Sequence, residues 1–146
     1  MMFTNFPFLS LLQAMLLARV ATAGLFMAHA VVRIANGSIP RFGQFMESQG
    51  FAPGEAVVWA ITACELVAGT LLILNRHVRL AAVALLGIAS GGILLIHRHI
   101  GWFVGEHGTG GSEYSVALIV LLLVICAADR ERHKAWPALE STGNMP

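Results

Sequence analysis

The residues best suited to chemistry gather in one polar segment, LIHRHIGWFVGEHGTGGSEYSVALIV, which runs from Leu95 to Val120 between two apolar stretches. Its histidines and carboxylates are His97, His99, Glu106, His107 and Glu113. Histidine exchanges protons near neutral pH, and a carboxylate can take part in acid–base chemistry. Trp102 can serve as a flat wall for a ring or as an anchor at a membrane interface. We expect this segment, together with His29, to bind the polar head of a ligand at a lipid boundary.

Metal or haem binding is the less favoured use of these histidines. His97 and His99 are two residues apart, which places them on opposite sides of a helix, so they converge only if the helix has already ended. The sequence contains neither a His-x-x-x-His nor a Cys-x-x-Cys pattern.

The glycine-rich stretch GEHGTGGSEYS also has a structural interpretation. Gly111 and the glycines before it allow the chain to turn tightly back into the membrane. Ser112 can cap the next helix, and Glu113 is expected in its first turn, where a carboxylate complements the helix dipole. Because no Lys follows the glycines, a phosphate-binding loop is excluded. Gly111 and Glu113 therefore have two open interpretations, as residues of a ligand site or as residues that form the turn and the start of the next helix.

Two charged residues, Arg19 and Glu65, lie deep inside apolar stretches. A charge near the middle of a membrane costs at least a few kcal/mol, so each needs a partner. Counted from the ends of their stretches, both lie about 14–15 Å deep. This depth predicts a bidentate Arg19–Glu65 ion pair. The pair is either a structural clasp that fixes the register of two helices or the base of a proton or substrate site.

Membrane helices must position all of these residues. Of 146 residues, 57% are hydrophobic and only 12% are charged, which is far from the composition of a soluble domain. Four apolar runs approach the roughly 20 residues that span a bilayer. They cover residues 9–32, 56–74, 80–96 and 114–128. Since the runs lack the alternation of barrel strands, the sequence predicts an all-α membrane protein, a four-transmembrane-helix bundle within residues 1–130.

The basic residues predict the orientation of the bundle. With four spans both termini share one side, and that side carries the two densest basic clusters, NRHVR (75–79) and DRERHK (129–134). The positive-inside rule places both termini in the cytoplasm, with a disordered tail over residues 131–146. The net charge of +1 gives no reason to expect nucleic acid. The expected partners are the lipid bilayer and either another protein or a second copy of the chain.

Two further patterns predict packing. In the first outer loop, FGQFMESQGF places Phe42, Phe45 and Met46 at helical spacing, which predicts a short amphipathic helix. Anchoring at the membrane surface is its favoured role, and a lid over the bundle is the alternative. In the third run Gly87 and Gly91 form a G-x-x-x-G step, which allows close helix approach within the bundle or between copies.

Several blocks of the chain resemble the DoxX family of small four-helix bacterial membrane proteins. LLARVATAGLFMAHAVVRIANG is similar to its first helix. FMESQGFAPGEAVVWAITACELVAGTLLILNRHVRLAA is similar to its most recognisable block, which has a central Glu followed by Gly and Leu. GWFVGEHGTGGSEYSVALIVLLLV is similar to its Gly-Gly-x-Glu/Asp-Tyr region. The resemblance covers about residues 16–128, and the ending AADRERHKAWPALE departs from the Gly-rich end of many members.

The resemblance implies a subunit of a redox system in the bacterial inner membrane, because relatives include the small subunit of a thiosulfate:quinone oxidoreductase and a methylamine-utilisation maturation protein. A quinone is the cofactor or substrate it suggests. The catalytic candidates are Arg19, Glu65 and Glu113, and the cofactor-binding candidates are His29, His97, Trp102 and Gly111. Two alternatives stay open: a non-catalytic anchor or assembly partner of another enzyme, and a proton or small-solute pathway.

Overall fold

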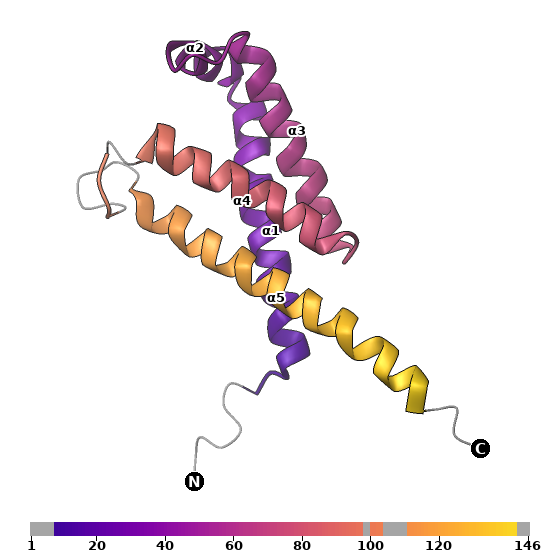
Figure 1. Cartoon of the computed structure of the whole chain (residues 1–146). Helices are drawn as coiled ribbons and strands as arrows, with labels where there is room; N and C mark the ends of the chain where they lie inside the picture. The colour runs from indigo at the N-terminus through magenta and orange to yellow at the C-terminus, as the bar shows by residue number, and fades with distance from the viewer. Residues whose placement is uncertain (1–7, 98–99, 104–110, 143–146) are drawn as a thin grey trace.

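A computed structural model describes residues 8–97, 100–103 and 111–142, with side chains described up to residue 132. It contains five helices, α1 (Leu11–Ala35), α2 (Ile39–Ser48), α3 (Gly54–Ile73), α4 (Val78–Leu95) and α5 (Ser112–Thr142) (Figure 1). Four of them, α1, α3, α4 and the Ser112–Arg132 part of α5, are long and apolar enough to cross a membrane. The predicted four-helix membrane bundle is confirmed, and the chain is a multi-pass membrane protein.

Local signals explain where the first helix begins. The hydroxyl of Ser10 accepts a hydrogen bond from the backbone of Gln13, and the Gln13 side chain accepts one from the backbone of Ser10. This reciprocal pair satisfies two of the N–H groups that a helix start leaves without partners. α1 therefore begins at Leu11, within two residues of the predicted start of the first span.

The end of the last helix differs from the expectation. α5 continues to Thr142, through twelve residues of the stretch 131–146 that we expected to be a disordered tail. The physical reason is that residues 130–142 include several helix-favouring Ala, Arg and Glu residues and extend a helix that the preceding span has already nucleated, so the helix continues past Pro137.

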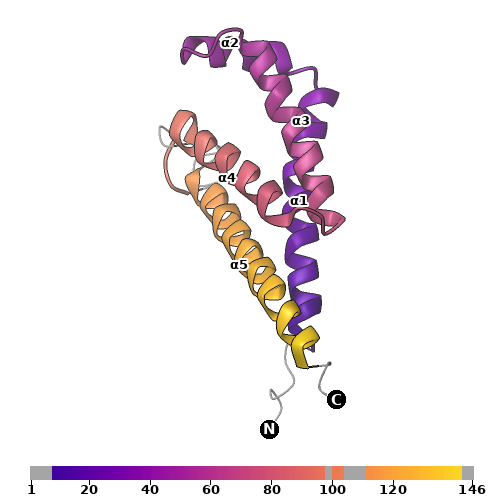
Figure 2. The ribbon, with the colours of Figure 1, turned by 45° about the vertical axis from the view of Figure 1, so that its right-hand side comes forward.

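The helices form two pairs that diverge toward one end of the bundle. α1 packs against α3, and α4 packs against α5, while α3 and α4 meet at the short turn that joins them. In Figure 2 the α1–α3 pair and the α4–α5 pair separate toward the side that carries α2. We call the end with α2 the α2 end. The opposite end, which holds the start of α1 and the α3–α4 turn at residues 74–77, is the turn end.

The main core lies where the two pairs meet. Its buried members include Ala23 and Phe26 of α1, Leu72 of α3, Ala82 and Leu85 of α4, and Leu118 and Leu122 of α5. The α1–α3 contact depends on Gly69, since a Cβ there would stand 2.5 Å from Cγ of Met27. Small residues at such crossings let helices approach closely, which is the main source of helix association in lipid.

The predicted amphipathic helix in the first loop is confirmed as α2. Its apolar side packs on α3, where Ile39 and Met46 are buried with Val58. A Cβ on Gly54 would overlap the carbonyl oxygen of Gly43, so the two helices touch backbone to backbone. The carboxylate of Glu47 accepts a hydrogen bond from the backbone N–H of Gly54 (3.0 Å) and so caps α3. This packing agrees with the alternative role of a lid, because the apolar side faces the protein.

A candidate ligand cavity between the helix pairs

The diverging pairs enclose a cavity of about 610 Å³ at the α2 end, lined by residues of all five helices. Most of the lining is apolar, with Phe26, Met46, Ile61 and Leu118 among the wall residues. Cavities of a few hundred to a thousand Å³ with apolar walls and a few placed polar groups are typical of small-molecule sites. Most of the polar groups here fall into two sets, the Arg33–Glu65 pair between α1 and α3, and a second set made up of His29, His97 and Tyr114.

The first set is an ion pair between Arg33 of α1 and Glu65 of α3. One terminal nitrogen of Arg33 lies 2.7 Å from Oε2 of Glu65, and the other lies 3.4 Å from Oε1. The first nitrogen also donates to the hydroxyl of Thr62 (2.7 Å), which itself donates to the carbonyl of Val58. The two charges therefore meet in a bidentate, hydrogen-bonded arrangement, which is the geometry that best offsets the cost of burying them.

The pair is almost removed from solvent and lipid. The Glu65 side chain is 4% exposed and the Arg33 side chain 14%. The guanidinium also lies over the ring of Phe42, 5.5 Å from its centroid, so α2 covers the pair with an aromatic face. Arg33, Glu65 and Phe42 all line the cavity, so the ion pair is a fixed polar group in an otherwise mostly apolar wall.

The predicted Arg19–Glu65 pair is wrong, because Arg19 lies near the turn end. Its terminal nitrogen donates to the side-chain oxygen of Asn75 in the α3–α4 turn. The predicted pair would require α1 and α3 to begin and end at the same depths in the membrane. Instead α1 is shifted toward the turn end, so that Arg19 is level with Asn75 and Arg33 is level with Thr62.

The second set consists of His29, His97 and Tyr114. The rings of His29 and Tyr114 are 6.1 Å apart and inclined by 53°, which links α1 to α5. Nδ1 of His97 is buried and has no hydrogen-bond partner among the described residues. Burial, and then the nearby His29, lower the pKa of His97. The direction of this shift favours the neutral form of His97, and its Nδ1 can form a hydrogen bond with a ligand.

Comparison with known proteins identifies the family of this chain. The DoxX family profile matches residues 14–98, which is more than half of the sequence. The chain belongs to the DoxX family. No curated protein and no solved structure matches it.

The DoxX match covers most of the cavity but not all of it. His29, Arg33, Glu65 and His97 lie inside residues 14–98, whereas Tyr114 and the rest of α5 lie outside. The part of the site that belongs to the family region thus contains both the ion pair and the two histidines. Among the described residues no group of three or more His, Cys, Asp or Glu could hold a metal ion.

Gly87 and Gly91 line the cavity of this DoxX protein instead of a helix contact. A Cβ at either position would meet no other atom within 4 Å in the part of the chain that the structure describes. The predicted close helix approach within the bundle is therefore wrong. The two glycines widen the cavity, since a larger side chain on this side of α4 would enter it.

Three predicted site residues lie together near the start of α5, away from the cavity lining. Trp102 is exposed, and Glu113 lies in the first turn of α5 as predicted. A Cβ on Gly111 would overlap the carbonyl oxygen of Trp102 and lie 2.5 Å from the carbonyl carbon of Phe103. Gly111 is thus needed for close backbone packing. Ser112 is the first residue of α5, and its hydroxyl donates to the carbonyl of Gly101. His99, Glu106 and His107 lie outside the described residues.

Sequence reasoning missed Arg33, Tyr114 and Ser115 as parts of the cavity, and Thr62 as a hydrogen-bond partner of Arg33. Arg33 stands just beyond the first apolar run, residues 9–32, so its position in the sequence indicates a residue at the membrane surface. A usable signal was present, since a helical side chain leans toward the N-terminus of its own helix and a long Arg side chain can reach one turn back into the membrane.

Proposed function

We propose that this DoxX-family protein binds a quinone in the cavity at the α2 end and serves as the membrane subunit of a redox system. The observation that carries the proposal is the pattern of the lining, which is mostly apolar but contains the Arg33–Glu65 pair and a few other polar side chains, among them His29, His97 and Tyr114. An isoprenoid quinone combines an apolar body with carbonyl oxygens that accept hydrogen bonds, and when bound it supplies two-electron, two-proton redox chemistry.

The residues fit such a ligand in distinct roles. The guanidinium of Arg33 is a fixed donor, with Glu65 and Thr62 holding its orientation. His97 offers its buried Nδ1 for proton exchange with a ligand head. His29 and Tyr114 line the same cavity, with their rings 6.1 Å apart. These residues, and not Arg19, Glu113, Trp102 or Gly111, are the ligand contacts we propose.

The orientation of the bundle is also a proposal. The turn end carries NRHVR and the basic start of the C-terminal segment, so the positive-inside rule supports placing both termini in the cytoplasm of a bacterium. The cavity then opens toward the outer side of the inner membrane. Electrons are exchanged with a separate partner protein of the same complex.

The test is quinone binding by the full chain purified in mild detergent. Co-purified quinone is extracted and identified by mass spectrometry, and affinity is measured with a short-chain quinone analogue. Gly91→Leu should fill the cavity and weaken binding at least tenfold, because its Cβ position is open and faces the lining. Gly24→Leu is the matched control, since Gly24 is an exposed membrane-helix glycine with an equally open Cβ position.

Two results would count against the proposal. The first is a wild-type protein that neither co-purifies with quinone nor binds the analogue. The second is equal weakening by Gly24→Leu and Gly91→Leu. A ligand-free protein that co-purifies with a stoichiometric partner, whose activity survives Arg33→Gln and His97→Gln, would favour the anchor function instead.

A further inference from the structure

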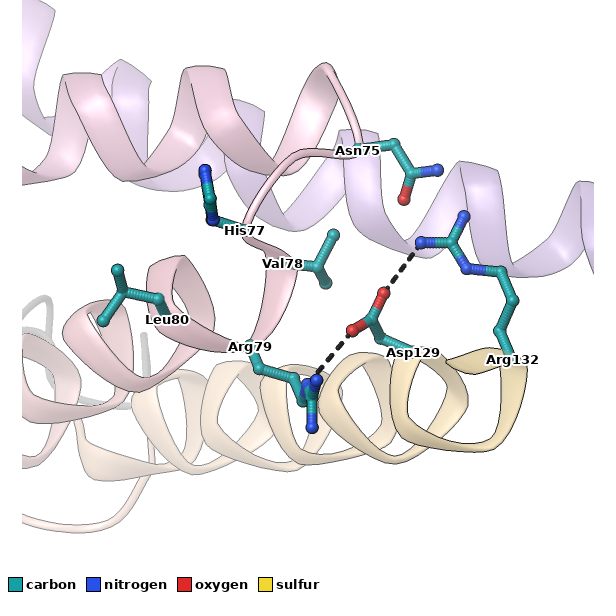
Figure 3. A pocket seen from close by; sticks show the side chains of 7 residues that line it. All are labelled: Asn75, His77, Val78, Arg79, Leu80, Asp129 and Arg132. Carbon is teal, nitrogen blue, oxygen red and sulfur yellow. Dashed lines mark hydrogen bonds and ion pairs between the residues drawn. The ribbon is translucent and has the colours of Figure 1, made fainter. Parts of the chain in front are cut away.

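A second pocket, of about 500 Å³, lies at the turn end, at the opposite end of the bundle from the ligand cavity (Figure 3). Its walls are the α3–α4 turn, the first turn of α4 and one face of α5. The spans α3 and α4 end and begin here, at Ile73 and Val78. A pocket at this level faces the head-group region of a bilayer.

Two arginines converge in this pocket on a single carboxylate. Nε of Arg79 lies 3.3 Å from one oxygen of Asp129, and a terminal nitrogen of Arg132 lies 2.9 Å from the other. Figure 3 shows the two guanidinium groups on opposite sides of the carboxylate. Two positive charges and one negative charge leave the cluster with a net charge of +1. The cluster thus carries an unbalanced positive charge, unlike the neutral Arg33–Glu65 pair.

The two arginines keep donors for another anion. Their side chains are 57% and 50% exposed, whereas that of Asp129 is 7% exposed. A guanidinium has five N–H donors, and the contacts with Asp129 use only the Nε of Arg79 and one terminal nitrogen of Arg132. Arginine is also the residue whose planar fork matches phosphate oxygens best.

The start of α4 and the side chain of Asn75 also favour an anion in this pocket. α4 begins at Val78 without a side-chain hydrogen bond at its cap, so the positive end of its dipole faces the pocket. Asn75 accepts a hydrogen bond from Arg19 through its oxygen, which leaves its NH₂ group as the donor. Arg19 itself forms no ion pair with a carboxylate of the described residues.

We propose that the turn-end pocket binds a phosphate group, carried by the head group of an anionic phospholipid or present as free phosphate. Arg79 and Arg132 bind its oxygens through donors that do not contact Asp129, while Asp129 keeps both guanidinium groups beside the pocket. This site is separate from the quinone site, and neither depends on the other.

The lipid source is tested by native mass spectrometry of the full chain in mild detergent with equal amounts of phosphatidylglycerol and phosphatidylcholine. We expect wild type to retain phosphatidylglycerol roughly tenfold better. The double variant Arg79→Gln/Arg132→Gln should bring the two lipids close to parity. Arg41→Gln/Arg130→Gln is the charge-matched control, because it removes two exposed arginines outside the pocket.

The free-phosphate source is tested by thermal unfolding in inorganic phosphate and in chloride of equal ionic strength. If free phosphate is the ligand, it raises the midpoint of wild type more than chloride does, and does not do so for Arg79→Gln/Arg132→Gln. A wild type with no preference for phosphatidylglycerol and no specific response to phosphate overturns the proposal. Equal loss in the charge-matched control overturns it as well.

Asp129→Asn distinguishes a binding site from a structural bridge. The substitution keeps the shape of the side chain and raises the net charge of the cluster from +1 to +2. A binding site should then retain phosphatidylglycerol, or respond to phosphate, several-fold more strongly. If the cluster is only structural, monodisperse Asp129→Asn protein will unfold at a lower temperature without any gain in anion binding, and the proposal fails.

Discussion

The two charged clusters of this protein differ in balance and in exposure. At the α2 end, Arg33 and Glu65 form a neutral pair that is nearly inaccessible and is tied to Thr62. At the turn end, Arg79 and Arg132 share Asp129, remain half exposed and leave a net positive charge. Burial explains the difference, because an unbalanced charge deep in the membrane is expensive whereas one at the interface remains solvated.

This comparison indicates different uses for the two ends. A neutral buried pair cannot attract a distant anion, but it provides a rigid hydrogen-bonding group in an apolar cavity. A positively charged cluster at the membrane surface instead attracts negatively charged groups. The largest consequences for stability should therefore come from the α2 end, and the largest consequences for anion binding from the turn end.

Breaking the buried pair should have the largest effect on stability. Glu65→Ala leaves the guanidinium of Arg33 without its carboxylate in a site that is 14% exposed, so we expect a loss of about 3–5 kcal/mol. Thermal unfolding of the purified protein, together with denaturant titration, measures the change. Replacing both partners, as Arg33→Met/Glu65→Leu, should restore much of the lost stability, because no charge then remains unpaired.

The double variant also separates structure from function. If the guanidinium of Arg33 is the hydrogen-bond donor to the quinone, the double variant should stay folded but lose quinone binding. A double variant as unstable as Glu65→Ala would mean that the pair is required for helix packing itself. Unchanged stability in both variants would contradict the buried pair.

The start of α5 allows a second, smaller test at the α2 end. Gly111→Ala places a methyl group against the carbonyl groups of Trp102 and Phe103, and we expect a loss of about 1–3 kcal/mol. Gly24→Ala, where a Cβ meets nothing within 4 Å, is the control and should cost little. If Gly111→Ala is stable but loses quinone, Gly111 binds ligand as the sequence suggested and packing is not its role.

The elements of this fold could be predicted from sequence because each rests on local information. Apolar runs near 20 residues predict the spans, and the helical spacing of Phe42, Phe45 and Met46 predicts α2. The candidate site was predictable in part, since His29 and His97 both line the cavity. His29 lies in the second half of α1 and His97 lies two residues after the end of α4, and both positions follow from counting residues along a span.

The partner of Glu65 could not be obtained in the same way. Choosing between Arg19 and Arg33 requires the axial shift between α1 and α3, and that shift is set by contacts such as Gly69 against Met27 and Gly54 against Gly43. These contacts join residues far apart in the chain. The role of Gly87 and Gly91 was missed for the same reason, because the spacing of small residues does not reveal whether another helix faces them.

The turn-end cluster should contribute less to stability than the buried pair does. Arg132→Ala removes one of two arginines from Asp129, and both arginines are half exposed, so we expect a loss of about 0–1 kcal/mol. The stability difference between wild type and Arg132→Ala should shrink as salt is raised, whereas the loss in Glu65→Ala should hardly change. A salt-dependent effect of Glu65→Ala would show that the α2-end pair is more accessible than its 4% exposure indicates.

The smallest expected effect is a pH dependence that originates at His97. Because its pKa is lower in the folded protein than in the unfolded chain, the unfolded chain takes up a proton more readily below about pH 6.5. Stability is therefore lost as the pH falls through this value, and the unfolding midpoint should be lower at about pH 5.5 than at about pH 7.5. His97→Gln should reduce this difference, and His77→Gln, which removes an exposed histidine at the turn end, is the control. Bound quinone should strengthen the dependence if it hydrogen-bonds the neutral ring. An equal reduction by both variants would place the pH response outside the cavity.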